Sequence, residues 1–491
     1  MIRLAHVGAI GALVVVSTGL GLAARAAGTV AWQPPERISA EDGSSGRFPS
    51  LAVDQRARAH VVWCAGARVE PTPASPGDRS RREQLDYAVR DAAGWSAPRA
   101  IAVGQRLIYR NALAVDLQDR LHLLFDYSPG SGFDVYYRQA PADDGFTEGN
   151  WQHPQLLNFR WNSYLSDIAV RGNALNVVMD DAGALDAPCP ACADIYFRRS
   201  IDGGETWSSP VSLRPSPVGS ARPRIRVDPA GVLHVTWDEG WDHNSGGGVP
   251  NYSVYMLSPD GGDSWSTPTI VELPQGSSAQ LAAAGDGRGG VLLVWRSAAE
   301  VSPGIYFQWS TDWGETWTEP AAIPAIMAGP WSAQDDRYDM ALDAAGRIHL
   351  LAAGVTSAEQ GRRALYHLEW DGERWSPPAT VYDRAGVPEY PQLAIDGAGG
   401  AHATWHVRRS SDETVPSEIW YGHGRVVDAP PPPEGPPVVL ARVLAPAPTP
   451  VPHPRRAEQN QPSINTDRVK ILLISLLVGF VIAALTGRLV R

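Results

Sequence analysis

The sequence is poor in cysteine and in charge, and it has no long basic run. It contains 3 cysteines in 491 residues, its charged fraction is 19%, and its formal net charge is -11 at pH 7. Binding to nucleic-acid phosphates requires clustered lysine and arginine, so this composition argues against a nucleic-acid partner. No second CxxC motif accompanies Cys189 and Cys192, which excludes a zinc site built from two such motifs.

Glycine, proline and tryptophan are abundant instead, with 48, 42 and 18 residues respectively. This mixture is typical of many turns and aromatic-rich strands rather than of helices. Because 491 residues exceed the usual size of one domain, the chain must divide into domains or be built from repeats.

The two ends are expected to lie outside the fold. Residues 1–27 combine Arg3, an apolar run and a small-residue site, as in a secretory signal peptide. Residues 468–491 contain an uncharged apolar run at 471–487, at the short limit for a membrane span, followed by a short basic tail. We therefore expect an exported, single-pass protein of the cell membrane with its C-terminus in the cytoplasm. No LPxTG sequence precedes the apolar run, although a processed C-terminal sorting tail remains an alternative.

A proline-rich stretch, residues 429–467, separates this anchor from the rest. Proline prevents helix and sheet formation and favours polyproline II, which rises about 3.1 Å per residue, so we expect a stalk of up to roughly 100 Å.

The remaining region, residues 28–428, repeats a pattern of an apolar run with an aspartate near its middle. Successive aspartates, or the residues that replace them, are roughly 53 to 62 residues apart, a period typical of propellers and solenoids. The apolar runs span residues 49–63, 111–125, 166–179, 223–237, 279–295, 338–352 and 391–405.

Each copy continues with an aromatic strand, a turn rich in aspartate and glycine, then tryptophan and proline. Two hairpins per copy make four strands, which is one propeller blade, so we predict an all-β propeller of seven blades, with six as the alternative. The last copy stops short of its fourth strand, and residues 31–38 have the pattern of that missing strand. We therefore expect the N-terminal strand to close the ring, which removes open sheet edges.

The pattern S-x-D-x-G-x-[TS]-W occurs at residues 200–207, 258–265 and 310–317. Its aspartate can accept backbone hydrogen bonds across the turn and its glycine permits unusual backbone angles. Turns on the outside of a ring cannot converge on one substrate, so we interpret them as scaffold. The residues concerned are Asp202, Trp207, Asp260, Trp265, Asp312 and Trp317. These segments resemble the Asp-box, or BNR repeat, of the sialidase superfamily, a resemblance that implies a propeller and says nothing about catalysis.

Histidines follow the repeat aspartate by six residues in five copies, at His60, His122, His234, His349 and His402. Both members of the pair are replaced together in the third and fifth copies, which indicates an Asp–His hydrogen bond that braces the inner hairpin. One pair per blade keeps the imidazoles apart, so we expect no metal site, and no cofactor is indicated.

Cys189 and Cys192 lie in a short loop of the third copy. In an exported protein such a spacing predicts a loop disulfide, and Cys64 is expected to be a buried thiol at a strand end.

Any binding site should lie where the chain enters the inner strands, since these entries meet around the mouth of the central channel. Arginine and tyrosine recur there, which suits an anionic or sugar ligand through bidentate contacts and stacking. A polar rim that pairs arginine with aspartate is the alternative. The candidate residues are Arg47, Arg110, Arg222, Arg337, Tyr109, Tyr164, Tyr338, Tyr390, Asp167 and Asp339.

The sialidase resemblance implies three arginines that bind a carboxylate, and Arg47, Arg222 and Arg337 are the matching candidates. Arg47-Phe48-Pro49 keeps the R-x-P part of the motif, with Gly46 in place of its aromatic residue. No motif identifies the acid/base aspartate or the Tyr-Glu nucleophile pair, so the catalytic residues are unknown. We therefore predict a monomeric surface propeller that binds glycan or protein ligands, with an exo-α-sialidase as the alternative.

Overall fold

The computed structural model describes residues 30–427 with gaps in that range. The gaps are 69–80, 105–106, 129–131, 160–161, 183–187, 190–191, 241–248, 274–276, 299–303, 329–337, 357–362 and 412–414. The expected signal peptide, stalk and membrane segment lie outside the described residues. Within them the structure is all-β apart from one 3-10 turn, η1 (Glu148–Asn150), and no helix has the length and apolar character to cross a membrane.

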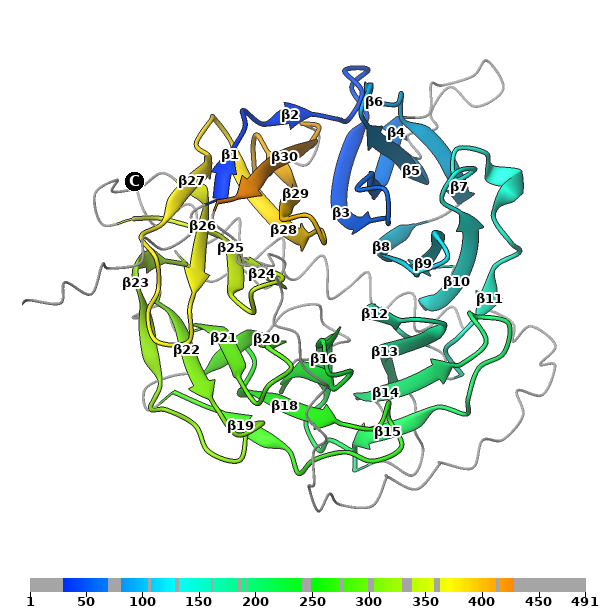
Figure 1. Cartoon of the computed structure of the whole chain (residues 1–491). Coiled ribbons are helices and arrows are strands. Elements are labelled where there is room, and N and C mark those ends of the chain that lie inside the picture. Colours follow the sequence, from blue (N-terminus) through cyan, green and yellow to red (C-terminus); the bar gives the residue numbers. More distant parts are fainter. Residues whose placement is uncertain are drawn as a thin grey trace, which may run out of the picture.

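Seven antiparallel sheets surround a central axis, so the described chain forms a seven-bladed β-propeller (Figure 1). This confirms seven blades rather than the alternative of six. In the first three blades neighbouring strands follow the chain order, except that the last strand of blade 1 pairs with the third. Blade 1 contains β3 (Ser45–Val53), β4 (Ala59–Arg68), β5 (Arg81–Asp91), β6 (Gly94–Trp95) and β7 (Arg99–Gly104). Blade 2 contains β8 (Ile108–Val115), β9 (Arg120–Tyr127), β10 (Asp134–Pro141) and β11 (Gln155–Leu156). Blade 3 contains β12 (Ser166–Arg171), β13 (Ala174–Ala182), β14 (Ala193–Ser200) and β15 (Val211–Arg214).

The next three blades repeat the same order, with the first strand of each nearest the axis (Figure 1). Blade 4 contains β16 (Ser220–Val227), β17 (Leu233–Glu239), β18 (Tyr252–Ser258) and β19 (Thr269–Val271). Blade 5 contains β20 (Ser278–Gly285), β21 (Val291–Ser297), β22 (Gly304–Ser310) and β23 (Ala321–Met327). Blade 6 contains β24 (Tyr338–Leu342), β25 (Ile348–Gly354), β26 (Ala364–Trp370) and β27 (Ala379–Tyr382).

Blade 7 is completed by the N-terminal segment. Its own strands are β28 (Val387–Ile395), β29 (Gly400–Arg408) and β30 (Glu418–Val426), and its outer edge is formed by β1 (Val30–Trp32) and β2 (Glu36–Arg37). Both N-terminal strands pair antiparallel with β30, in the registers Val30↔Val426 and Glu36↔Tyr421. The predicted ring closure by residues 31–38 is therefore confirmed.

The hydrophobic core is divided among the spaces between neighbouring blades. One cluster joins Leu292 and Ile305 of blade 5 to Leu350 and Tyr366 of blade 6, and all four side chains are buried. Every residue of β21 and β25 is buried, because adjacent blades cover both faces of these strands. Consecutive apolar residues are required in strands covered on both faces, which explains the runs that mark the repeats.

Candidate functional site

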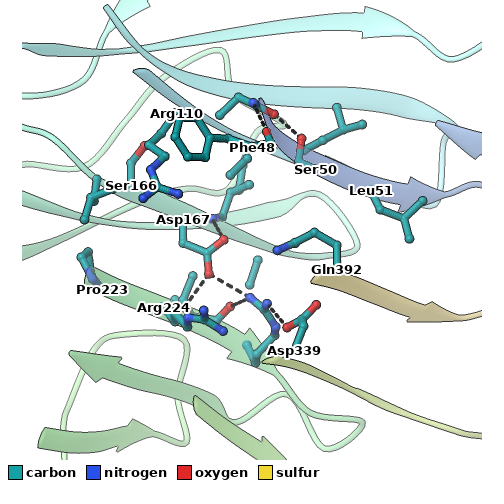
Figure 2. Close-up of a pocket in the computed structure, with 18 of the residues that line it drawn as sticks. Phe48, Ser50, Leu51, Arg110, Ser166, Asp167, Pro223, Arg224, Asp339 and Gln392 are labelled. Carbon is teal, nitrogen blue, oxygen red and sulfur yellow. Dashed lines mark hydrogen bonds and ion pairs between the residues drawn. The ribbon is translucent and has the colours of Figure 1, made fainter. Parts of the chain in front are cut away.

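A cavity of about 310 Å³ lies on the propeller axis and is lined by six of the seven inner strands, β3, β8, β12, β16, β24 and β28 (Figure 2). The lining begins near the starts of the inner strands, where the channel mouth was expected, and continues along most of β12 and to the end of β16. The charged side chains in the lining are Arg110, Asp167, Arg222, Arg224, Arg226 and Asp339. Because four are arginine and two are aspartate, the lining has a formal charge of +2.

The inner strand is irregular at the same point in blades 1, 4, 5 and 7. Its pairing register with the second strand shifts there, and the residue at the shift has a positive φ: 54° at Phe48, 59° at Arg222, 59° at Gln280 and 52° at Tyr390. Such bulges re-aim a side chain, and bulky residues rarely adopt this backbone conformation. Phe48, Arg222 and Tyr390 all line the cavity, so strained backbone presents these side chains to the axis.

Proline follows the bulged residue in three of these four blades, at Pro49, Pro223 and Pro391. Proline cannot donate a ladder hydrogen bond, so within sheets it is confined to edges and bulges. The local sequence therefore explains why pairing is interrupted there.

Arg110 of β8 is held among aromatic rings. Its guanidinium carbon lies 4.1 Å from the centroid of Phe48 and 4.2 Å from that of Tyr390, and its Nη2 donates to the Tyr390 hydroxyl over 2.7 Å. Tyr109 approaches from another side, with its centroid at 5.2 Å. Cation–π contacts of this kind fix a guanidinium in one orientation. The side chain of Arg110 is thus positioned in advance beside the cavity.

Deeper along β16, Arg226 joins three blades. Its Nη1 donates to Asp167 of blade 3 and its Nη2 to Asp339 of blade 6, each over 2.8 Å. The same two carboxylates accept the backbone N–H groups of Ile225 and Leu393 on their neighbouring inner strands. Burial by itself would lower the pKa of Arg226, but the two carboxylates raise it above its ordinary value. This network fixes the relative positions of the inner strands.

Half of the ten residues predicted at the channel mouth line the cavity, and the others are not part of its described lining. Arg110, Arg222, Tyr390, Asp167 and Asp339 line the cavity together.

The other candidates do not belong to the described lining. Arg47 lies with its guanidinium carbon 5.9 Å from the Phe48 ring, and Tyr164 packs against Tyr109 and Phe133. Tyr338 is fully buried and its hydroxyl donates to the backbone carbonyl of Gln280, so its side chain braces the neighbouring blade. Arg337 lies outside the described residues.

Among the charged and aromatic residues of the lining, three were not predicted as site residues: Phe48, Arg224 and Arg226. The signal for the arginines was available, because alternate residues of a strand face one side and the segment Pro223-Arg224-Ile225-Arg226 alternates in this way. No sequence signal identifies the aromatic contacts of Phe48, which depend on its positive φ.

The Asp-box turns lie between the third and fourth strands of blades 3, 4 and 5, far from the cavity lining. In the first of them Asp202 accepts the Thr206 backbone N–H at 3.0 Å, and the Ser200 hydroxyl accepts the backbone N–H of Gly204 at 2.8 Å. The tryptophan packs on the preceding blade, with the Trp207 and Tyr137 ring centroids 5.0 Å apart. These turns therefore join adjacent blades, which is a structural role.

The inner hairpin turns are braced by a repeated triad, here called the Asp–His–Tyr clasp. In blade 1, His60 Nε2 lies 3.2 Å from Asp54 Oδ2 and His60 Nδ1 lies 2.7 Å from the Tyr87 hydroxyl. The predicted Asp–His bracing is confirmed, and the tyrosine is an addition that the sequence analysis missed. Equivalent clasps are Asp116–His122–Tyr137, Asp228–His234–Tyr255 and Asp396–His402–Tyr421.

The cysteines are separate from the cavity. Cys189 and Cys192 form a disulfide in a loop of blade 3. Cys64 is a free, buried thiol as expected, but it lies in the middle of β4 and not at a strand end; burial raises its pKa to about 12. A thiol with such a pKa stays protonated, so Cys64 is not a nucleophile at neutral pH.

A protein-family model matches part of the chain. Residues 184–403 match the family model described as a BNR repeat-like domain. No sequence among the curated proteins matches the chain.

Several solved structures are similar in fold. A protein of unknown function from Dyadobacter fermentans DSM 18053 is 12% identical, with 81% of this chain and 99% of that chain covered and a TM-score of 0.46. The NanB sialidase from Streptococcus pneumoniae is 13% identical, with 80% and 70% covered and a TM-score of 0.42. The intramolecular trans-sialidase from Ruminococcus gnavus is 15% identical, with 82% and 99% covered and a TM-score of 0.42. Similarity at this level says nothing about the chemistry of this chain.

Proposed function

We propose that the axial cavity of this β-propeller, whose residues 184–403 match a BNR repeat-like domain, binds an acidic glycan through the carboxylate of a terminal sugar. The observation that carries the proposal is the convergence of Arg110, Arg222 and Arg224 on one cavity. The lining has a formal charge of +2 in a chain whose net charge is -11. Positive charge concentrated in a cleft of an acidic protein selects an anionic ligand.

The remaining surface of the cavity suits a sugar. Its volume of about 310 Å³ is at the small end of the range for ligand pockets and corresponds to one sugar residue. Phe48 and Tyr390 offer ring surface beside the arginines. A planar guanidinium can make two parallel hydrogen bonds to a carboxylate, which supplies both affinity and orientation.

We propose binding rather than hydrolysis as the main activity. A sialidase-type mechanism needs a tyrosine activated by a glutamate. In the described lining the tyrosine is Tyr390, and its hydroxyl accepts a hydrogen bond from Arg110. The neighbouring Glu389 is engaged elsewhere, by His406 Nε2 at 3.0 Å and by Arg408.

We further propose that the protein acts as a monomer at the cell surface. Residues 1–27 would direct export, residues 468–491 would anchor the chain, and residues 429–467 would hold the propeller away from the bilayer. Retention of the full chain in the membrane pellet after alkaline extraction tests the anchor, and its release into the supernatant would contradict it.

The binding proposal is tested by titrating the full chain with a sialylated trisaccharide and with the matching neutral disaccharide. We expect saturable binding of the acidic sugar alone, without release of free sialic acid from a fluorogenic sialoside. Equal binding of both sugars would contradict carboxylate recognition, and turnover of the sialoside would establish the hydrolase alternative.

A further inference from the structure

Blade 6 departs from the Asp–His–Tyr clasp of blades 1, 2, 4 and 7. Its aspartate and histidine are present as Asp343 and His349, but the position of the tyrosine on the third strand is occupied by His367. In the same blade the residue paired across the strands with His349 is Glu369. The corresponding partners in blades 1, 2, 4 and 7 are Val89, Gln139, Leu257 and His423.

The two replacements bring three side chains of metal-binding type together. His349 Nδ1 lies 2.9 Å from His367 Nε2 and 3.8 Å from a carboxylate oxygen of Glu369. All three candidate ligand atoms lie within 4.8 Å of one another. Ligand atoms around a tetrahedral zinc ion, at 2.0 to 2.2 Å from the metal, are about 3.4 Å apart. The two distances bracket this value, so small side-chain rotations would place all three atoms around one ion.

Burial makes this cluster unusual. His349, His367 and Glu369 are 0%, 2% and 3% exposed. Oε1 of Glu369 makes no hydrogen bond to any described residue, and a buried carboxylate oxygen without a partner is costly. Arg347 Nη1 donates a hydrogen bond to the other oxygen, Oε2, over 3.5 Å. A cation between Oε1 and the two imidazoles would satisfy the free oxygen.

We propose that His349, His367 and Glu369 bind a divalent transition metal of the zinc class within blade 6. Two imidazoles and one carboxylate are a donor set that zinc accepts in proteins. Asp343 Oδ2 lies 3.3 Å from His349 Nε2, so it can hold the ring with Nδ1 toward the metal, as outer-shell carboxylates do. The hydrogen now shared between the two imidazoles would be displaced when the metal binds, because both nitrogens must offer lone pairs.

The closing strand covers this site. The ring of Trp32 in β1 meets His367 edge-on, with centroids 5.6 Å apart. A metal bound by His349 and His367 would therefore stabilise the blade against which the N-terminal strand packs. Because the ligands are buried, the metal should enter during folding and exchange slowly afterwards.

The proposal is tested by measuring metal content in the full chain produced with added zinc and then dialysed against a chelator. Wild-type chain should retain about one zinc per molecule. The His367→Tyr variant restores the clasp of the other blades, so it should fold normally and carry at least tenfold less zinc. A cobalt-loaded wild-type sample should show the strong visible absorption of a tetrahedral site, and His367→Tyr should lack it.

Two further variants make the test specific. Glu369→Gln keeps the shape of the side chain but removes its charge, and should lower zinc affinity by at least about 10-fold, because loss of an outer-shell partner alone costs about 10- to 100-fold. Tyr255→His places two histidines together in blade 4, where the third position is Leu257, and should add no zinc. Zinc at background level in wild type, or equal zinc in wild type and His367→Tyr, would overturn the proposal.

Discussion

The two ends of the inner strands differ in how closely the blades repeat. At the hairpin end, four blades carry the same Asp–His–Tyr clasp with nearly the same distances. At the mouth end, the corresponding bulged positions carry different residues, namely Phe48, Arg222, Gln280 and Tyr390. The repeated residues stabilise the closed ring, in which every blade must pack against its neighbours in the same way. Departure from repetition marks the places where one particular ligand or ion would be bound.

Removal of the N-terminal segment that closes the ring should have the largest effect on stability. Both the hairpin end and the mouth end of the inner strands depend on an intact ring. Deletion of residues 30–38 leaves the outer edge of β30 unpaired, while its pairing with β29 remains. Unpaired edges promote aggregation, so we expect loss of cooperative thermal unfolding and of monomeric protein in size-exclusion chromatography. A monomeric truncated chain that melts like wild type would show that closure is not needed.

Arg222→Ala should weaken an acidic glycan by about 1.5 to 3 kcal/mol, the scale of a hydrogen bond to a charged group. Arg222→Lys should recover only part of this loss, since an ammonium cannot reproduce the planar two-point contact. Arg47→Ala is the matched control, because Arg47 is outside the described lining and should affect binding little. Titration calorimetry measures all three, and equal losses at Arg222 and Arg47 would contradict the assignment.

Asp260→Ala should affect stability and leave binding unchanged. Asp260 accepts hydrogen bonds from the Ser264 backbone and hydroxyl and from Ser258, all in an outer turn. We expect the free energy of unfolding to fall by about 1 to 3 kcal/mol in urea denaturation. Loss of ligand binding in a variant with a normal melting temperature would place the Asp-box in the binding site.

The smallest effect should be an acid-dependent loss of stability at the hairpin end. Burial acts to raise the pKa of Asp54, but hydrogen bonds from His60 and Arg58 lower it overall. A carboxyl group with a lowered pKa in the folded state stabilises the protein above its unfolded value of 3.8, and this stability is lost as the pH falls further. The urea concentration at the unfolding midpoint should therefore decrease as the pH falls below about 4. In Asp54→Asn this decrease should be less steep. Identical pH dependence in both proteins would contradict this.

Much of the fold could be predicted from the sequence, because one copy of the repeat marks each of the seven blades. The residues 31–38 could be assigned to closure because the last copy lacked a strand of that pattern. The cavity was harder to predict, since the positive φ of Phe48 depends on how the blade bends at a bulge. Arg226 was missed because its partners, Asp167 and Asp339, come from two other blades. His367 was missed because histidines were compared along the second strands only.

The central claim is that the cavity recognises a carboxylate, and chemical masking of the ligand tests it most directly. The full chain would be titrated with the methyl α-glycoside of N-acetylneuraminic acid and with the methyl ester of the same glycoside. The two ligands differ at the carboxyl group, so the account predicts at least tenfold weaker binding of the ester, with the difference shrinking in Arg222→Ala. Equal affinity of acid and ester for wild-type protein would contradict the account.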